Sequence, residues 1–147
     1  MNDSAAQRSL IVGRLAGIPG RLAAGATAAN ARPVPPGEWS SSEVVRHLIA
    51  VELEVWQPRL AQLAVEDHPE WPWVEPGPWP GEPSASLARL LERYAEGRGA
   101  TVAALESLDE AGWTKTGLHA TFGELDAAGL MTRAVDHDEE HLAGLAT

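Results

Sequence analysis

The sequence predicts an all-α protein, a four-helix bundle formed by a single domain over residues 1–147. Three observations carry this prediction. Apolar residues recur three and four positions apart in four separate segments, which is the spacing of one face of a helix. No segment alternates apolar and polar residues with the period of two that a half-buried strand shows. A long connection rich in proline and tryptophan separates the second and third segments, as a crossover in a bundle would.

The first helix is predicted from a narrow apolar stripe that ends before a proline-rich linker at residues 32–37. Its apolar positions are Ile11, Leu15, Ile18 and Leu22. Pro19 lies inside this pattern and several glycines flank it, so we expect a kink or a break there, because proline removes one helical hydrogen bond. The second helix is predicted to begin at Ser40, with Glu43 completing a capping box, and to run to about Val65 with a bend at Pro58.

The crossover is predicted over residues 66–83, where the density of proline excludes a helix. It contains Trp71, Trp73 and Trp79. The favoured interpretation is that these rings pack the crossover onto the bundle, and the alternative is that they cover a pocket.

The third helix is predicted to begin after Ser84, and residues 112–117 are predicted to form a turn. The fourth helix is predicted to begin at Thr121, with Glu124 as a second capping box, and to run nearly to the C-terminus. The expected buried face of the third helix comprises Leu87, Leu91, Tyr94, Thr101, Leu105 and Leu108.

Three histidines are the candidate metal ligands. His137 and His141 lie four residues apart, a spacing that places them about 5–6 Å apart at Cβ on one helix face. Both border the apolar arc of the fourth helix, and His47 borders the apolar arc of the second. Bundles build metal sites from side chains that face one another at such seams. The alternatives are surface histidines for the pair and a hydrogen-bonded residue at the core edge for His47.

Of the four other polar residues of interest, Asp138 and Arg98 admit two interpretations each. Asp138 falls within the apolar arc of the fourth helix, either as a partner or extra ligand of the metal site or as a surface residue of a slightly rotated helix. Arg98 falls on the apolar stripe of the third helix, where it can hold an anionic group of a substrate or thiol, or extend to the surface. His68 and His119 are predicted to be solvated loop residues.

Composition limits the classes of function. Twenty-one acidic residues against 11 basic ones give a formal charge of −10, which disfavours nucleic-acid binding. The chain has no cysteine, so it offers no disulfide, thiolate ligand or cysteine nucleophile, and this usage fits a cytoplasmic protein. No apolar run approaches the ~20 residues of a membrane span. Arginines interrupt the N-terminal apolar stretch, which therefore lacks the uninterrupted apolar core expected of a signal peptide.

Two segments resemble a known family. The first reads Glu38-Trp39-Ser40 and then Glu43-Val44-Val45-Arg46-His47-Leu48, followed by Glu52 and Trp56. The second reads Phe122-Gly123-Glu124-Leu125 and then His137-Asp138-Glu139-Glu140-His141-Leu142. From about Trp39 to its end, the chain is similar to the DinB/YfiT-like superfamily of metalloenzymes.

The resemblance implies a metal triad of His47, His137 and His141 in a site that opens to solvent, and a four-helix bundle with a long connection after the second helix. It implies a divalent metal such as zinc or nickel, and a possible homodimer. Relatives of this kind include thiol-dependent S-transferases that use mycothiol, bacillithiol or glutathione. One departure is Gly144, where the family usually has a polar residue.

The chemistry of such a triad supports a thiol S-transferase acting on small electrophiles. Three neutral imidazoles leave the charge of the ion intact and one coordination position free, and a thiol bound there loses its proton. Because the chain has no cysteine, the thiol is expected to be a low-molecular-weight co-substrate. The first alternative is a metal-dependent hydrolase with the same triad. The second is a non-catalytic dimeric helical protein whose metal is structural or absent.

Overall fold

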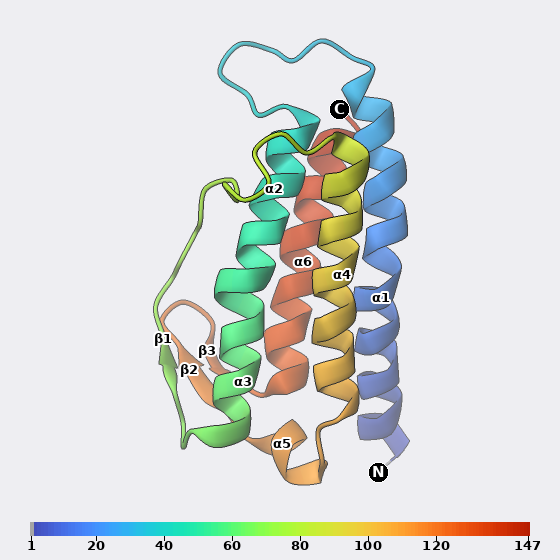
Figure 1. Ribbon diagram of the computed structural model, residues 1–147. Coiled ribbons are helices and arrows are strands. Elements are labelled where there is room, and N and C mark those ends of the chain that lie inside the picture. Colours follow the sequence, from blue (N-terminus) through green and yellow to red (C-terminus); the bar gives the residue numbers. More distant parts are fainter. Residues whose placement is uncertain (1) are drawn as a thin grey trace.

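The computed structural model describes the backbone of residues 2–147 and the side chains from residue 4 onward. Four long helical segments lie side by side (Figure 1). The first and last of these segments along the chain, α1 and α6, run in one direction, and the second and third run in the other. The first segment is α1 Asn2–Asn30, the third is α4 Leu87–Glu106 and the fourth is α6 Ala127–Leu145. The second is continuous and consists of α2 Ser41–Val51, the π-helix η1 Glu52–Trp56 and α3 Gln57–Val65. The core lies between them and includes Leu15, Leu22, Leu48, Leu90, Tyr94 and Leu130.

Helix α1 continues through Pro19, so the helix does not break there. Proline cannot donate to the carbonyl four residues earlier, which here belongs to Leu15. The side chain of Arg98 from α4 reaches that carbonyl, and its Nη1 donates to Leu15 O over 3.2 Å. A tertiary hydrogen bond therefore replaces the helical one that Pro19 removes.

The second helical segment begins as predicted, at a capping box formed by Ser40 and Glu43. Ser40 Oγ accepts from the backbone N–H of Glu43, and the Glu43 side chain accepts from the backbone N–H of Ser40. Before Pro58 the helix widens into η1, where the N–H of Gln57 donates to Glu52 O, five residues earlier. This wider turn gives the proline ring room without ending the helix.

The later helix boundaries differ from the predictions. Helix α4 is capped by Ser86, whose side chain accepts from the backbone N–H of Arg89, so it begins a few residues after the predicted start. Helix α6 is capped by Asp126 and not by Thr121. Gly123 has φ of +77°, a conformation that breaks a helix and favours glycine. Leu90, outside the predicted buried face of α4, is fully buried, while Leu87 and Leu91 are only partly buried.

A small sheet makes the all-α prediction incomplete. Its strands are β1 Glu70–Trp71 in the crossover, β2 Gly117–His119 and β3 Gly123–Leu125. Strand β2 pairs parallel with β1 and antiparallel with β3. The predicted turn also contains a short helix, α5 Glu110–Thr114. Two or three residues are too few for a period of two to be recognised in the sequence, and the β1–β2 pairing is non-local.

The segment between α3 and α4 carries the chain back along the bundle (Figure 1) and is fixed to the second helical segment by side chains. Arg46 donates to the carbonyl oxygens of Trp79, Gly81 and Glu82 at 2.9, 2.6 and 2.7 Å. The indole N–H of Trp71 donates to Gln62 at 2.8 Å. These bonds give an extended, proline-rich segment a defined path past α2.

The three crossover tryptophans have two different roles. Trp71 is buried, and Trp79 packs against the core, as expected if they hold the crossover on the bundle. Trp73 is exposed over 58% of its surface and lines a pocket, which is the alternative interpretation. Among the described residues, no helix is long and apolar enough to cross a membrane. The homodimer and the cytoplasmic location stay predictions.

Candidate metal site

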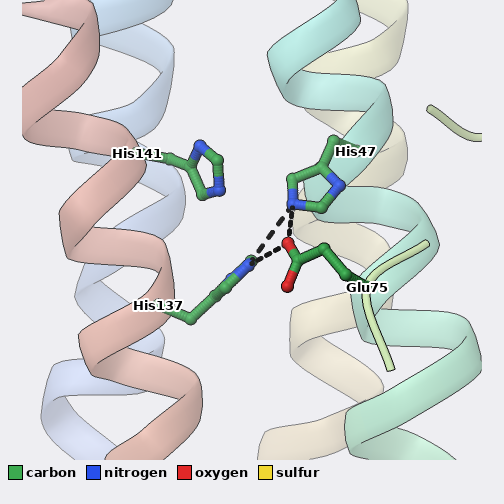
Figure 2. A group of neighbouring side chains, drawn as sticks. All are labelled: His47, Glu75, His137 and His141. Atoms are coloured by element: carbon green, nitrogen blue, oxygen red, sulfur yellow. Dashed lines mark hydrogen bonds and ion pairs between the residues drawn. The ribbon is translucent and has the colours of Figure 1, made fainter. Parts of the chain in front are cut away.

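The three predicted histidines meet between α2 and α6, together with a fourth residue, Glu75 (Figure 2). One ligand atom from each residue can be chosen so that all four lie within 4.8 Å of one another. The Nε2 atoms of His47 and His137 are 3.3 Å apart. The ring of His141 lies 4.7 Å from that of His47 and 4.8 Å from that of His137, measured between centroids. The helix pairing therefore brings together residues that are about 90 positions apart in the chain.

Glu75 was not among the predicted site residues. It comes from the crossover, and its Oε1 lies 3.1 Å from His47 Nε2 and 3.4 Å from His137 Nε2. The sequence offered one relevant signal, because a long connection in a compact domain is often functional. It offered no means of choosing Glu75 among the acidic residues of that segment, since that choice depends on where the crossover is fixed.

His47 is held in one orientation by the crossover. Its side chain is fully buried, and its Nδ1 lies 2.8 Å from the carbonyl oxygen of Pro76. A carbonyl only accepts, so Nδ1 carries the proton and Nε2 presents its lone pair toward the site. Burial lowers the pKa of His47 despite this hydrogen bond. The neutral ring is therefore favoured, which is the form that binds a metal.

His137 is oriented by the buried carboxylate of Asp138. His137 Nδ1 lies 3.2 Å from Asp138 Oδ1, which directs Nε2 toward the other ligands. Burial by itself lowers the pKa of His137, but the hydrogen bond and charge of Asp138, with the charge of Glu75, raise it overall. Of the two interpretations of Asp138, the structure supports that of a partner behind a candidate ligand. A carboxylate in that place fixes the ring and makes its nitrogen more basic.

Asp138 belongs to a buried network centred on Arg98. Tyr94 donates to Asp138 Oδ2 at 2.7 Å, and Arg98 forms an ion pair with the same oxygen. Arg98 also donates to both oxygens of Glu52, at 2.8 and 3.1 Å, and Glu52 accepts from Thr101 at 2.5 Å. Burial opposes ionisation of Asp138, but its partners lower its pKa. One buried cation thus faces two buried carboxylates, and a cation at the histidines would balance the remaining negative charge.

The prediction that Arg98 binds an anionic group of a ligand is not supported by its position. The side chain is 1% exposed, and the carboxylates of Glu52 and Asp138 with the carbonyl of Leu15 occupy its donors. The helical pattern placed Arg98 correctly on the inner face of α4. It gave no indication that two carboxylates from other helices would lie opposite it.

The donor set fits a divalent transition metal. Bonds of about 2.0–2.1 Å in a tetrahedral site separate two ligand nitrogens by roughly 3.3 Å, the separation observed between His47 and His137. His141, whose pKa is lowered by burial and by the other two histidines, is also favoured in its neutral form. Imidazole and carboxylate ligands of this kind suit zinc and nickel among other ions.

A pocket of about 250 Å³ lies beside the four-residue cluster and shares His137 and Glu75 with it. Its walls are mostly apolar and come from the end of α2, η1, α3, the crossover, β2, the β2–β3 turn and α6. It is lined by Val51, Val55, Trp56, Arg59, Trp73, Val74, Glu75, His119, Phe122, Arg133, Asp136, His137 and Glu140.

The two predicted loop histidines differ from each other. His68 is exposed as predicted, and its Nε2 lies 2.6 Å from Glu124. His119 is 4% exposed, so the prediction of a solvated residue is wrong. It lies on β2, where its Nδ1 accepts from the backbone N–H groups of Thr121 and Phe122. Its ring lies against those of Trp73 and Phe122, at centroid distances of 6.3 and 4.7 Å, contacts that the sequence pattern did not indicate.

A helical bundle with three histidines and a carboxylate converging between two of its helices defines a candidate metalloprotein. The chain belongs to the DinB superfamily, whose family model matches residues 14–145, and this confirms the resemblance seen in the sequence. Among solved structures, it is similar to YfiT from Bacillus subtilis, described as a probable metal-dependent hydrolase with an unusual four-helix bundle topology. That match has a TM-score of 0.72 at 18% identity and covers 95% of this chain and 83% of YfiT. No curated protein matches the chain.

Replacing Asp138 by asparagine is expected to weaken zinc binding by about 10–100-fold, because the carboxylate that orients His137 and makes its ring more basic is lost. The matched control is Asp136→Asn, which removes an exposed carboxylate two positions earlier on the same helix. Competition with a chromophoric chelator measures both affinities. Equal affinities for the two variants would contradict the assigned role of Asp138.

Proposed function

We propose that the protein binds one divalent metal ion through His47, His137 and His141 and hydrolyses a small substrate held in the adjoining pocket. The observation that carries this proposal is the position of Glu75, whose carboxylate lies 3.1 and 3.4 Å from two of the candidate ligand nitrogens. When bound, the ion supplies Lewis acidity at neutral pH. The name given to YfiT, a probable metal-dependent hydrolase, is consistent with this chemistry.

Glu75 has the properties of a general base. Its side chain is 45% exposed, so a water molecule and a substrate can both reach it. A carboxylate within hydrogen-bond reach of an attacking water accepts the proton that the water releases. The crossover holds Glu75 next to His47 through the hydrogen bond of the following residue, Pro76, to that histidine. The base and the candidate ligands are therefore positioned by the same segment.

The thiol S-transferase is the second candidate function. It is favoured by the mostly apolar pocket, which suits a small electrophile, and since the chain has no cysteine the thiol would come from a small molecule. The same three imidazoles would favour a bound thiolate from mycothiol, bacillithiol or glutathione. A requirement for the thiol separates the two functions, since the hydrolase turns over its substrate without one.

Glu75→Gln is expected to lower the rate of hydrolysis by about 10²–10⁴-fold, the usual contribution of a general base, and to leave the metal content unchanged. Zinc- and nickel-loaded protein is assayed against a panel of small esters and amides, and against a halogenated electrophile with each thiol. Glu140→Gln is the matched control, because it removes another carboxylate of the pocket that lies outside the histidine cluster.

The outcomes separate the alternatives. Loss of metal from Glu75→Gln would make Glu75 a ligand and contradict its role as a base. A rate that requires both metal and thiol would favour the S-transferase. No metal-dependent rate with any thiol, ester or amide would favour the non-catalytic protein.

A further inference from the structure

Arg59 is a buried cation of the pocket that forms no ion pair with any residue whose side chain is described. It lies on α3, is 6% exposed and lines the pocket beside the histidine cluster. Its Nη2 donates to the carbonyl oxygen of Pro72 at 2.6 Å, and its guanidinium lies 5.8 Å from the centroid of the Trp71 ring. Among the residues with described side chains, none forms an ion pair with Arg59. Burial without a compensating carboxylate lowers its pKa.

Arg133 lies on α6 and lines the same pocket. Its guanidinium is stacked on the Phe122 ring, 4.1 Å from the centroid. Within the described part of the chain it also forms no ion pair. The charges of both arginines act on His119, whose pKa is lowered by burial first and then by Arg59 and Arg133. The two guanidinium groups therefore form the basic region of the pocket, on the side where His119 of β2 lies, and His119 itself is favoured in its neutral form.

This basic region is unusual for a strongly acidic protein. The chain has 21 acidic residues, yet none of those with described side chains pairs with Arg59 or Arg133. Arg98, the other buried arginine described above, is paired with two carboxylates, Glu52 of η1 and Asp138 of α6. A buried charge without a partner is costly, and a carboxylate from a ligand offsets that cost. Arginine is also the side chain best suited to bidentate recognition of a carboxylate.

We propose that the pocket binds a small molecule with an apolar body and one carboxylate, which pairs with Arg59 and Arg133. The body of the ligand lies against Trp73, Phe122 and Val55, and its other end reaches Glu75 and His137. Pockets that bind drug-sized ligands measure roughly 300–1,000 Å³. The volume of this pocket, about 250 Å³, suits a smaller ligand. Asp136 and Glu140 also line the pocket, and their charges disfavour ligands with several negative groups.

This inference rests on the proposed function only for the identity of the reacting end, and carboxylate binding is testable without turnover. The probes are phenylacetate and phenylacetamide, which share a shape and differ in charge. We expect metal-free protein, prepared by chelation, to bind phenylacetate at least about tenfold more tightly than phenylacetamide in calorimetric titrations. Arg133→Gln and Arg59→Met are each expected to reduce that preference at least about threefold, since each removes one of two charge-assisted partners.

The matched control is Arg93→Gln. Arg93 is also half-buried and stacked on an aromatic ring, Trp79, at 5.5 Å, but it lies outside the pocket. It is expected to leave the preference unchanged. Circular dichroism shows whether each variant folds. If Arg59→Met does not fold, Arg133→Gln is the decisive variant.

Equal binding of the charged and neutral probes would overturn the proposal. A preference for phenylacetate that is unchanged in both Arg59→Met and Arg133→Gln would also overturn it. So would a preference that is present only in zinc-loaded protein, because the carboxylate would then bind the ion. A failure of the hydrolase and S-transferase assays leaves this result unaffected, so the two proposals fail separately.

Discussion

His141→Ala is expected to raise the dissociation constant for zinc by about 10²–10³-fold and to abolish any metal-dependent turnover. Structural zinc sites with four ligands contribute about 10–16 kcal/mol of binding free energy, or roughly 3 kcal/mol for each ligand, and about 1.4 kcal/mol corresponds to a factor of ten. His141 lies on the same helix face as His137, one turn further on. Its removal leaves the other two histidines and their hydrogen-bond partners in place.

Metal content after mild dialysis, measured by mass spectrometry, and affinity, measured by chelator competition, provide the test. His68→Ala is the control, because His68 is exposed and paired with Glu124 away from the candidate site. Thermal unfolding of the metal-free proteins separates loss of a ligand from loss of the fold. Equal metal in His141→Ala and wild type, or no metal in wild type after supplementation with zinc or nickel, would refute the assignment of the triad.

The grouping of the three histidines was predictable because it depends on helix periodicity. A spacing of four places His137 and His141 on one face, and the apolar arcs of two helices indicate which faces meet. Glu75 and the pocket were not predictable in the same way. They depend on the path of the crossover, which is set by Arg46, Gln62 and Arg59 bonding to backbone and side-chain groups of an extended segment. No periodicity in the sequence encodes such contacts.

The two capping boxes show why identical local patterns had different outcomes. Ser40 with Glu43 begins a helix, as the pattern predicts. Thr121 with Glu124 has the same spacing, but Gly123 adopts a left-handed conformation and residues 123–125 pair with β2. The backbone N–H of Thr121 donates to buried His119. The pairing of residues 123–125 with β2 therefore prevents a helix from beginning at Thr121. Helix α6 begins after Asp126, which is itself a good N-cap residue.

The apolar stripe of α4 identified Arg98 as an inward-facing residue but not as the centre of a buried ionic network. Its partners come from η1 and α6, and their positions depend on the wider turn before Pro58 and on the pairing of α4 with both helices. Arg98 also supplies the hydrogen bond that Pro19 removes from α1. One side chain thus connects all four helical segments and supports the histidine site through Asp138.

Arg98→Met is expected to lower the free energy of unfolding by about 3–5 kcal/mol, because it leaves the buried carboxylates of Glu52 and Asp138 without their cation. Methionine is of similar length and apolar, so the loss reflects charge and hydrogen bonding more than a cavity. Urea unfolding of metal-free protein followed by circular dichroism measures the change. Arg89→Met is the matched control on the same helix, since Arg89 also pairs with two carboxylates, Glu82 and Glu96, but at the surface. Water screens those pairs, and a much smaller change is expected.

A second substitution separates charge from packing. If uncompensated negative charge causes the loss, adding Glu52→Gln to Arg98→Met restores part of the stability, because a neutral amide is less costly to bury than an unpaired carboxylate. In wild type the same Glu52→Gln substitution is expected to destabilise the protein, since it removes an ion pair from Arg98 at 2.8 Å and leaves that cation with a single carboxylate. The opposite signs of Glu52→Gln in the two backgrounds measure the coupling directly. If Glu52→Gln destabilises both backgrounds equally, the network stabilises the bundle by packing alone, and Asp138 is held behind His137 without help from the charge of Arg98.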